Sequence, residues 1–165
     1  MSLLTICESD MTFSHPVADF FSLENSQSHK QLNDASQPQG LKIAEAALLK
    51  DGKVLLIEAK TSQPQNLKKF VADICAKLEH ALLLFVNLHL QRHAEPLPAG
   101  LSQLELKQME FRFVLVVKTS KKAWLAPLRD ALDKALRRLQ LLFAIKAPAV
   151  FVFNEDMARS HKLIV

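Results

Sequence analysis

The stretch that decides the fold is residues 41–60, LKIAEAALLKDGKVLLIEAK. Two apolar runs flank Asp51-Gly52, a residue pair that favours a two-residue hairpin turn with both central residues at positive φ. We therefore predict two antiparallel strands joined by a tight turn.

The turn fixes which residues of the two strands lie opposite each other. The predicted pairs are Lys50 with Lys53, Leu49 with Val54, Ala47 with Leu56, Glu45 with Glu58, and Ile43 with Lys60. Because side chains alternate across a strand, Glu45, Glu58 and Lys60 share one face of the sheet. Like charges directly opposite each other cost stability. A divalent metal or a nearby lysine would supply the compensating charge.

Composition favours one globular domain. The chain has 165 residues, of which 49% are hydrophobic and 23% charged, enough for one substantial core. We divide it into residues 1–40, a core of residues 41–153 and a C-terminal tail of residues 154–165. The net charge of +4 permits an anionic partner without establishing one.

The first 40 residues carry weak local signals. We predict a short strand near Leu3–Ile6 and a short helix over Pro16–Glu24. Residues 25–40, NSQSHKQLNDASQPQG, are polar and lack an apolar period, so they are expected to form a mobile loop that could close over a site.

The clearest helix follows the hairpin, over Pro64–Gln91, with Ser62 as its expected N-cap. Its apolar residues recur at three- and four-residue spacing. The second half is apolar nearly all round, so it must be buried by other elements or by another subunit. We take this as a hint of a homodimer formed through this helix.

The rest of the chain completes an α/β pattern. We predict a loop over Arg92–Gln108, a strand over Phe111–Lys118, a helix over Lys121–Ala144 and a strand over Ala149–Phe153. Pro127 is expected in the first turn of that second helix, and the expected inward residues are Trp124, Leu128, Leu132, Leu136, Leu139 and Phe143. Helices between the later strands imply parallel pairing, while the hairpin is antiparallel. The expected architecture is a mixed central sheet with an antiparallel hairpin and flanking helices.

Cellular location is predicted from the cysteines and the apolar runs. Cys7 and Cys75 match no metal or redox spacing, so the simplest expectation is reduced thiols in a cytoplasmic protein, and a disulfide between them is the open alternative. The densest apolar run, Ala81–Leu90, is too short to span a bilayer. We expect no membrane partner.

The paired glutamates suit a hard divalent cation such as Mg²⁺ or Mn²⁺, which takes oxygen ligands. Lys60 points the same way and could orient a water or stabilise charge on a phosphate. Lys68 and Lys69, early in the next helix, could meet a phosphate backbone. This set suits metal-dependent phosphodiester hydrolysis. The alternative is a solvent-facing strand with cross-strand ion pairs, each contributing little.

Glu58-Ala59-Lys60 at the end of an apolar strand, with an acid on the neighbouring strand and a helix after it, resembles the PD-(D/E)xK nuclease superfamily. The resemblance implies a restriction-endonuclease-like fold. It also implies that Glu45 and Glu58 bind metal, that Ala59 contributes its carbonyl and that Lys60 assists catalysis. Some members add an acid from an N-terminal helix, and Glu24 is the candidate here.

Two functions follow as hypotheses. The first is Mg²⁺-dependent hydrolysis of nucleic acid, with DNA as the expected substrate. The second is a catalytically inactive protein of the same fold, which uses the Pro64–Gln91 helix to dimerise or to bind a partner.

Overall fold

The predicted hairpin lies at the centre of the fold. The computed structural model describes residues 1–165, and strands β4 (Ala46–Lys50) and β5 (Lys53–Lys60) pair antiparallel. Asp51 and Gly52 have φ of 50° and 72°, as the turn requires. Lys50 lies opposite Lys53 and the ladder ends at Ala46 opposite Ile57, which confirms the predicted register within the strands. The pairs predicted beyond that point, Glu45 with Glu58 and Ile43 with Lys60, lie outside the ladder, because the N–H of Ala44 donates instead to the carbonyl of Lys77 in the helix after β5.

The hairpin belongs to a five-stranded sheet with the order β3-β4-β5-β6-β7. Strand β3 (Phe20–Ser22) pairs antiparallel with β4. Strands β6 (Glu110–Val117) and β7 (Val150–Phe153) continue the sheet in parallel from β5. The mixed α/β architecture and both later strands are therefore confirmed.

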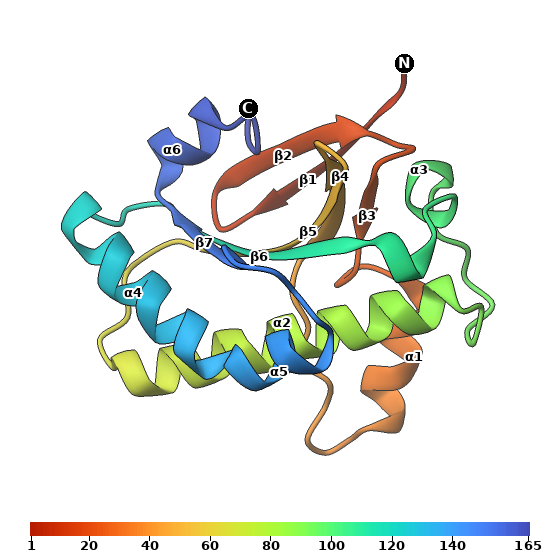
Figure 1. Ribbon diagram of the computed structural model, residues 1–165, viewed down its shortest axis with the longest axis horizontal. Helices are drawn as coiled ribbons and strands as arrows, with labels where there is room; N and C mark the ends of the chain where they lie inside the picture. The colour runs from red at the N-terminus through yellow and green to blue at the C-terminus, as the bar shows by residue number, and fades with distance from the viewer.

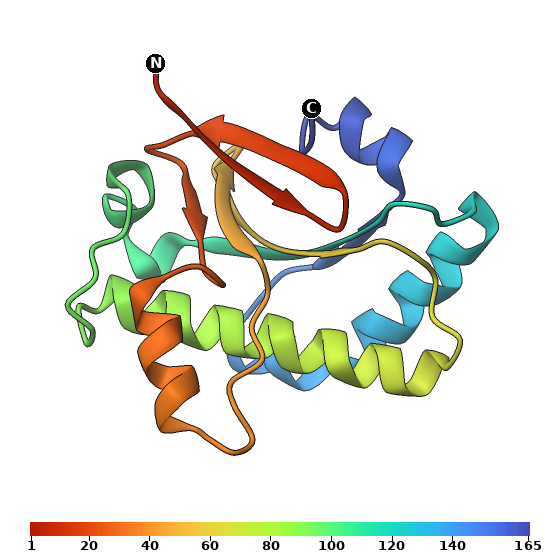
Figure 2. The ribbon, with the colours of Figure 1, turned by 180° about the vertical axis from the view of Figure 1, so that it is seen from behind.

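Helices cover one face of this sheet. Figures 1 and 2 show α2 (Leu67–His89), α4 (Lys122–Ala135) and α5 (Arg137–Leu142) on the same side. They enclose the larger core, which includes Leu56 and Phe113 from the sheet and Phe85 from α2.

A second, smaller core lies on the opposite face. The separate hairpin of β1 (Leu3–Glu8) and β2 (Met11–Pro16) covers it together with α6 (Glu155–Ser160), as Figure 1 shows. Ile57 and Ala59 of β5 contribute to this core, whereas Leu56 faces the helices. Strand alternation therefore turns Glu58 towards α2.

The N-terminal region is more ordered than predicted. The strand near Leu3–Ile6 is confirmed as β1, but the helix expected over Pro16–Glu24 is wrong, because this segment contains β3. The mobile loop expected over residues 25–40 is also wrong, because it contains α1 (Gln27–Ala35). Caps stabilise α1: the N–H of His29 donates to Oγ of Ser26, and the N–H groups of Gln27 and Ser28 donate to the Glu95 carboxylate.

Several helix boundaries also differ from expectation. Helix α2 is capped by Asn66 rather than Ser62, because the Asn66 side chain accepts from the N–H of Lys69. The helix expected over Lys121–Ala144 is two helices that meet at Leu136. Pro127 lies inside α4 rather than in its first turn.

The buried face of α4 and the segments 92–108 and 154–165 also differ from expectation. Trp124 is 52% exposed instead of inward, because Leu125, Leu128 and Leu132 form the buried stripe of α4. Residues 92–108 include the short helix α3 (Ala99–Ser102) and a 3-10 turn at Leu106–Gln108. The tail contains α6, and Leu163 and Ile164 are buried in the smaller core.

The apolar second half of α2 is covered by the chain itself. Its buried residues, Leu78, Ala81, Leu82, Leu84, Phe85 and Leu88, belong to the larger core. Leu83 remains exposed. The sheet and α4 cover the apolar residues of α2 that suggested a homodimer. The homodimer stays a prediction. None of the helices has the length and apolar character needed to cross a membrane.

Candidate metal centre

Backbone hydrogen bonds place Glu45 between β3 and β5. It lies one residue before β4, and its N–H donates to the carbonyl of Ile57 at 2.9 Å. Its carbonyl accepts from the N–H groups of Leu23 and Glu24, at 2.9 and 3.3 Å. These bonds hold the start of the hairpin beside the segment that follows β3, and so bring Glu24 to Glu45.

Glu58 is held by two lysines on the helical side of the sheet. Its Oε1 accepts from Nζ of Lys60 and from Nζ of Lys77 in α2, both at 2.9 Å. The side chain of Glu58 has no exposed surface. The predicted placement of Glu58 and Lys60 on one face is confirmed, and Lys77 adds a second cation from the helix.

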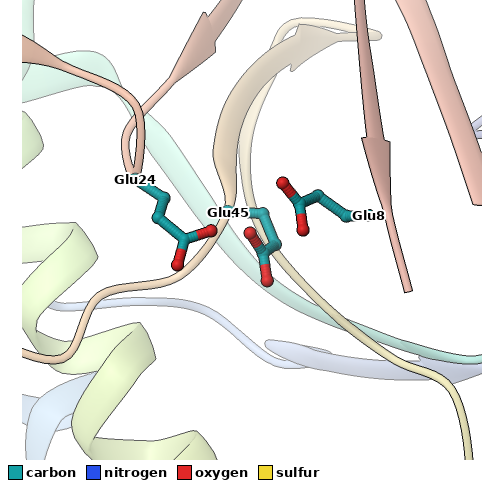
Figure 3. A group of neighbouring side chains, drawn as sticks. All are labelled: Glu8, Glu24 and Glu45. Carbon is teal, nitrogen blue, oxygen red and sulfur yellow. The ribbon is translucent and has the colours of Figure 1, made fainter. Parts of the chain in front are cut away.

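Three further carboxylates gather beside this ion pair. Glu8, at the end of β1, lies with Glu24 and Glu45 so that one oxygen of each is within 4.8 Å of the others. Figure 3 shows Glu45 between Glu24 and Glu8, each of which points its carboxylate towards it. The cluster joins the N-terminal hairpin to the central sheet.

The crowding of acids perturbs their pKa values. Burial, the hydrogen bond to Glu24 and the neighbouring charges raise the pKa of Glu45 to about 10. The same hydrogen bond lowers the pKa of Glu24, which is therefore the acceptor of the pair. Burial also raises the pKa of Glu58, although Lys77 and Lys60 act against it. Without a cation, this site favours retaining a proton on Glu45.

Two buried oxygens of the site lack a partner. Oε2 of Glu45 and Oε2 of Glu58 receive no hydrogen bond from any donor, and Glu45 is only 5% exposed. An unsatisfied buried polar atom usually costs about 1–3 kcal/mol, and more when charged. Each of these oxygens is therefore free to accept a hydrogen bond or to bind a cation.

The donor set fits a hard divalent cation. Carboxylate oxygens are the ligands that Mg²⁺ and Mn²⁺ prefer. The three carboxylates whose oxygens lie within 4.8 Å of one another are those of Glu8, Glu24 and Glu45, and Glu58 is not one of this group. The lysines occupy Oε1 of Glu58 and leave Oε2 for such a ligand. Lys60 lies at the edge of this set and can donate to an anion that reaches it.

The other predicted site residues, Ala59, Lys68 and Lys69, do not direct their side chains into the acid cluster. Ala59 follows Glu58 in β5, with its methyl group buried in the smaller core. Lys68 and Lys69 are exposed in the first turn of α2 and form no salt bridge, whereas Lys77 of the same helix reaches Glu58. The structure does not bring Lys68 or Lys69 into the acid cluster.

Sequence reasoning missed Glu8 and Lys77. Glu8 comes from a hairpin distant in sequence, and no periodic signal marks it. Lys77 had a usable signal, because it stands between Ile74 and Ala81 at helical spacing, on the buried stripe of α2. A lysine within an apolar stripe requires a buried acid as its partner. Glu58 is that partner.

Comparison of the chain with protein-family models, with curated proteins and with solved structures found no match in any of the three.

Proposed function

We propose that this protein is a metal-dependent nuclease, with Mg²⁺ or Mn²⁺ as its cofactor and DNA as its substrate. The observation that carries the proposal is the pair of buried, unpartnered oxygens on Glu45 and Glu58, beside further carboxylates and Lys60. This combination is what a PD-(D/E)xK-like site would need. The restriction-endonuclease-like fold belongs to the same proposal.

Each residue has a defined part in the proposed site. Glu45 and Glu58 would hold the metal through their Oε2 atoms, with Glu24 and Glu8 as further carboxylate donors and the Ala59 carbonyl as another oxygen. The bound cation would supply Lewis-acid charge and lower the pKa of a water. Lys77 keeps Glu58 in place from the helical side.

Lys60 is the proposed catalytic lysine. Its ammonium group contacts Oε1 of Glu58 at 2.9 Å and remains partly exposed, so it can also reach a substrate phosphate. There it would stabilise negative charge that develops during hydrolysis. Exposed Lys68 and Lys69 would contact the phosphate backbone outside the site.

Metal-dependent cleavage of DNA by matched variants tests this function. Glu58→Gln keeps the shape of the side chain and Lys60→Gln removes the lysine charge, and each is expected to abolish cleavage of plasmid DNA in Mg²⁺ or Mn²⁺. Glu79→Gln, at an exposed position of α2, is the control and should cleave normally. Cleavage that survives Glu58→Gln, or that persists in EDTA, would contradict the proposal.

Metal binding separates the active enzyme from the inactive alternative. A cation that binds only the folded state raises the melting temperature. A rise with Mn²⁺ that Glu45→Gln removes, combined with no cleavage of DNA or RNA, would favour a protein that kept the site but lost the chemistry. Size-exclusion chromatography tests the homodimer separately.

A further inference from the structure

A cavity opens on the smaller-core face of the sheet, and none of the clustered acids Glu8, Glu24 and Glu45 lines it. It has a volume of about 310 Å³ and lies at the hairpin-turn end of β5, next to Lys53. Glu58 and Lys60 lie at the other end of the same strand. Leu55, Val114 and Leu163 supply apolar lining. Its size is at the lower end of the range for small-molecule sites, which is about 300–1,000 Å³.

A pair of lysines gives this cavity an unbalanced positive charge. Lys50 and Lys53 lie directly opposite each other across the turn, and both line the cavity. Neither forms a salt bridge, and Asp51 is the only acidic residue of the lining. Like charges at paired strand positions cost stability. An anion between them would offset that cost.

Arg112 adds a buried guanidinium to the same lining. It is 6% exposed; its Nη1 donates to the carbonyl of Phe111 at 2.7 Å and its Nη2 donates to Oε2 of Glu110 at 3.0 Å. A guanidinium has five N–H donors in a fixed plane. Because the protein accepts only two of these hydrogen bonds, donors remain for a ligand in the cavity.

A row of aromatic rings completes the lining. The centroids of Phe151 and Phe153 are 6.0 Å apart, with an interplanar angle of 28°. Those of Phe153 and His161 are 4.7 Å apart, at 23°. All three residues line the cavity. Such rings accept flat, aromatic ligands by stacking.

We propose that this cavity binds one nucleotide unit, with the base against the aromatic row and the phosphate at Lys50 and Lys53. The lining combines cations with an aromatic surface, which is the chemistry that a base linked to a phosphate requires. A free mononucleotide and a nucleotide of a single strand share this chemistry. The site is independent of the metal centre and does not rest on the proposed nuclease function.

Calorimetric titration with AMP in EDTA tests the proposal without any contribution from metal. Wild-type protein should bind AMP saturably, and adenosine and ribose 5-phosphate should each bind more weakly. The double variant Lys50→Gln/Lys53→Gln should weaken AMP binding by about tenfold or more, since it removes both phosphate contacts. Lys107→Gln/Lys134→Gln, which removes two exposed lysines elsewhere, is the matched control.

A second variant tests the aromatic contribution. Phe151→Leu keeps an apolar side chain but removes a ring, and it should weaken AMP binding by about fivefold or more. A thermal melt of each variant verifies that it folds. Titration with the oligonucleotide (dA)₆ identifies the source of the nucleotide: tighter binding than AMP indicates a strand, and weaker binding a free nucleotide.

Three results would overturn the proposal. The first is no saturable binding of either AMP or (dA)₆. The second is unchanged affinity in folded Lys50→Gln/Lys53→Gln protein, and the third is an equal loss in the matched control.

Discussion

At the scale of single residues, Glu58 shows how the site balances charge. It is fully buried, and the two lysines that reach it both contact the same oxygen. The arrangement offsets one negative charge with two positive ones while leaving Oε2 without a partner. Lys60 and Lys77 therefore stabilise the carboxylate without blocking the oxygen that would bind metal.

Lys77→Met should destabilise the fold more than loss of a surface ion pair does. Breaking a buried pair costs about 3–5 kcal/mol, and because Lys60 still contacts Glu58, we expect about 2 kcal/mol here. Lys42→Met, which removes an exposed partner of Asp73, is the control and should cost under about 1 kcal/mol. Urea unfolding measures both free energies. Equal losses would show that the buried pair has no special role.

Glu45→Gln should stabilise the metal-free protein at neutral and alkaline pH. The folded-state pKa of Glu45, about 10, lies above its ordinary value of 4.5. The unfolded state therefore loses the proton first, and the free energy of unfolding of the wild type falls as pH rises from about 4.5 to about 10. Gln resembles the protonated carboxyl and removes this dependence.

Melting temperatures in EDTA at pH 5 and pH 8.5 measure this effect. The melting temperature of the variant should exceed that of the wild type by several degrees at pH 8.5 and by much less at pH 5. In a chain of this size, each kcal/mol of unfolding free energy shifts the melting temperature by about 2–4 °C. With Mn²⁺ present, the order should reverse, because only the wild type gains stability from the ion. A constant difference across pH would contradict the assigned protonation.

At the scale of elements, the β4–β5 turn is the feature on which the position of Glu58 depends. Gly52 has a φ of 72°, and a Cβ at this position would meet no atom within 4 Å. Gly52→Ala should therefore cost only the backbone strain, about 1–2 kcal/mol. Gly52→Asn should cost less, because Asn tolerates the left-handed region. Urea unfolding compares the two, and equal costs would show that the turn has another constraint.

The sequence predicted secondary structure best where turn preferences and the spacing of apolar residues match the burial in the fold. Asp51-Gly52 and the alternating apolar residues predicted the hairpin register, and the three- and four-residue spacing predicted α2. The sequence was least informative where side-chain contacts replace apolar periodicity. Helix α1 has one buried residue, Ser28, and depends on Ser26 and Glu95 as caps. Strand β3 has only three residues and exists because β4 pairs with it.

The residues of the candidate site also fall into two groups, those placed by local sequence patterns and those placed by tertiary contacts. Glu58 and Lys60 follow from the turn and the two-residue alternation of β5. Glu45 lies just outside the ladder and is placed by backbone hydrogen bonds to Ile57, Leu23 and Glu24. Glu8 and Lys77 reach them through tertiary packing, which no local pattern encodes. Burial is also a property of the whole fold, and it is burial that leaves Oε2 of Glu45 and Oε2 of Glu58 without partners.

At the scale of the whole molecule, the acid cluster connects two separate sheets. Glu8 belongs to the β1–β2 hairpin, whereas Glu45 belongs to the start of the central hairpin and Glu24 follows β3. A two-stranded sheet is marginally stable by itself, so the N-terminal hairpin depends on its contacts with the smaller core. A cation shared by the three carboxylates would add a direct link between the sheets.

This link predicts a change in hydrogen exchange across distant segments. Mn²⁺ should slow amide exchange around Glu8 and in residues 23–24 as well as at the start of β4, because opening of the N-terminal hairpin would then require release of the ion. Glu8→Gln should remove the protection of the hairpin while leaving that of the central strands. Mass spectrometry with and without Mn²⁺ measures all segments in one experiment. Protection confined to residues 41–60 would show that Glu8 is not a ligand and that metal binding does not join the two sheets.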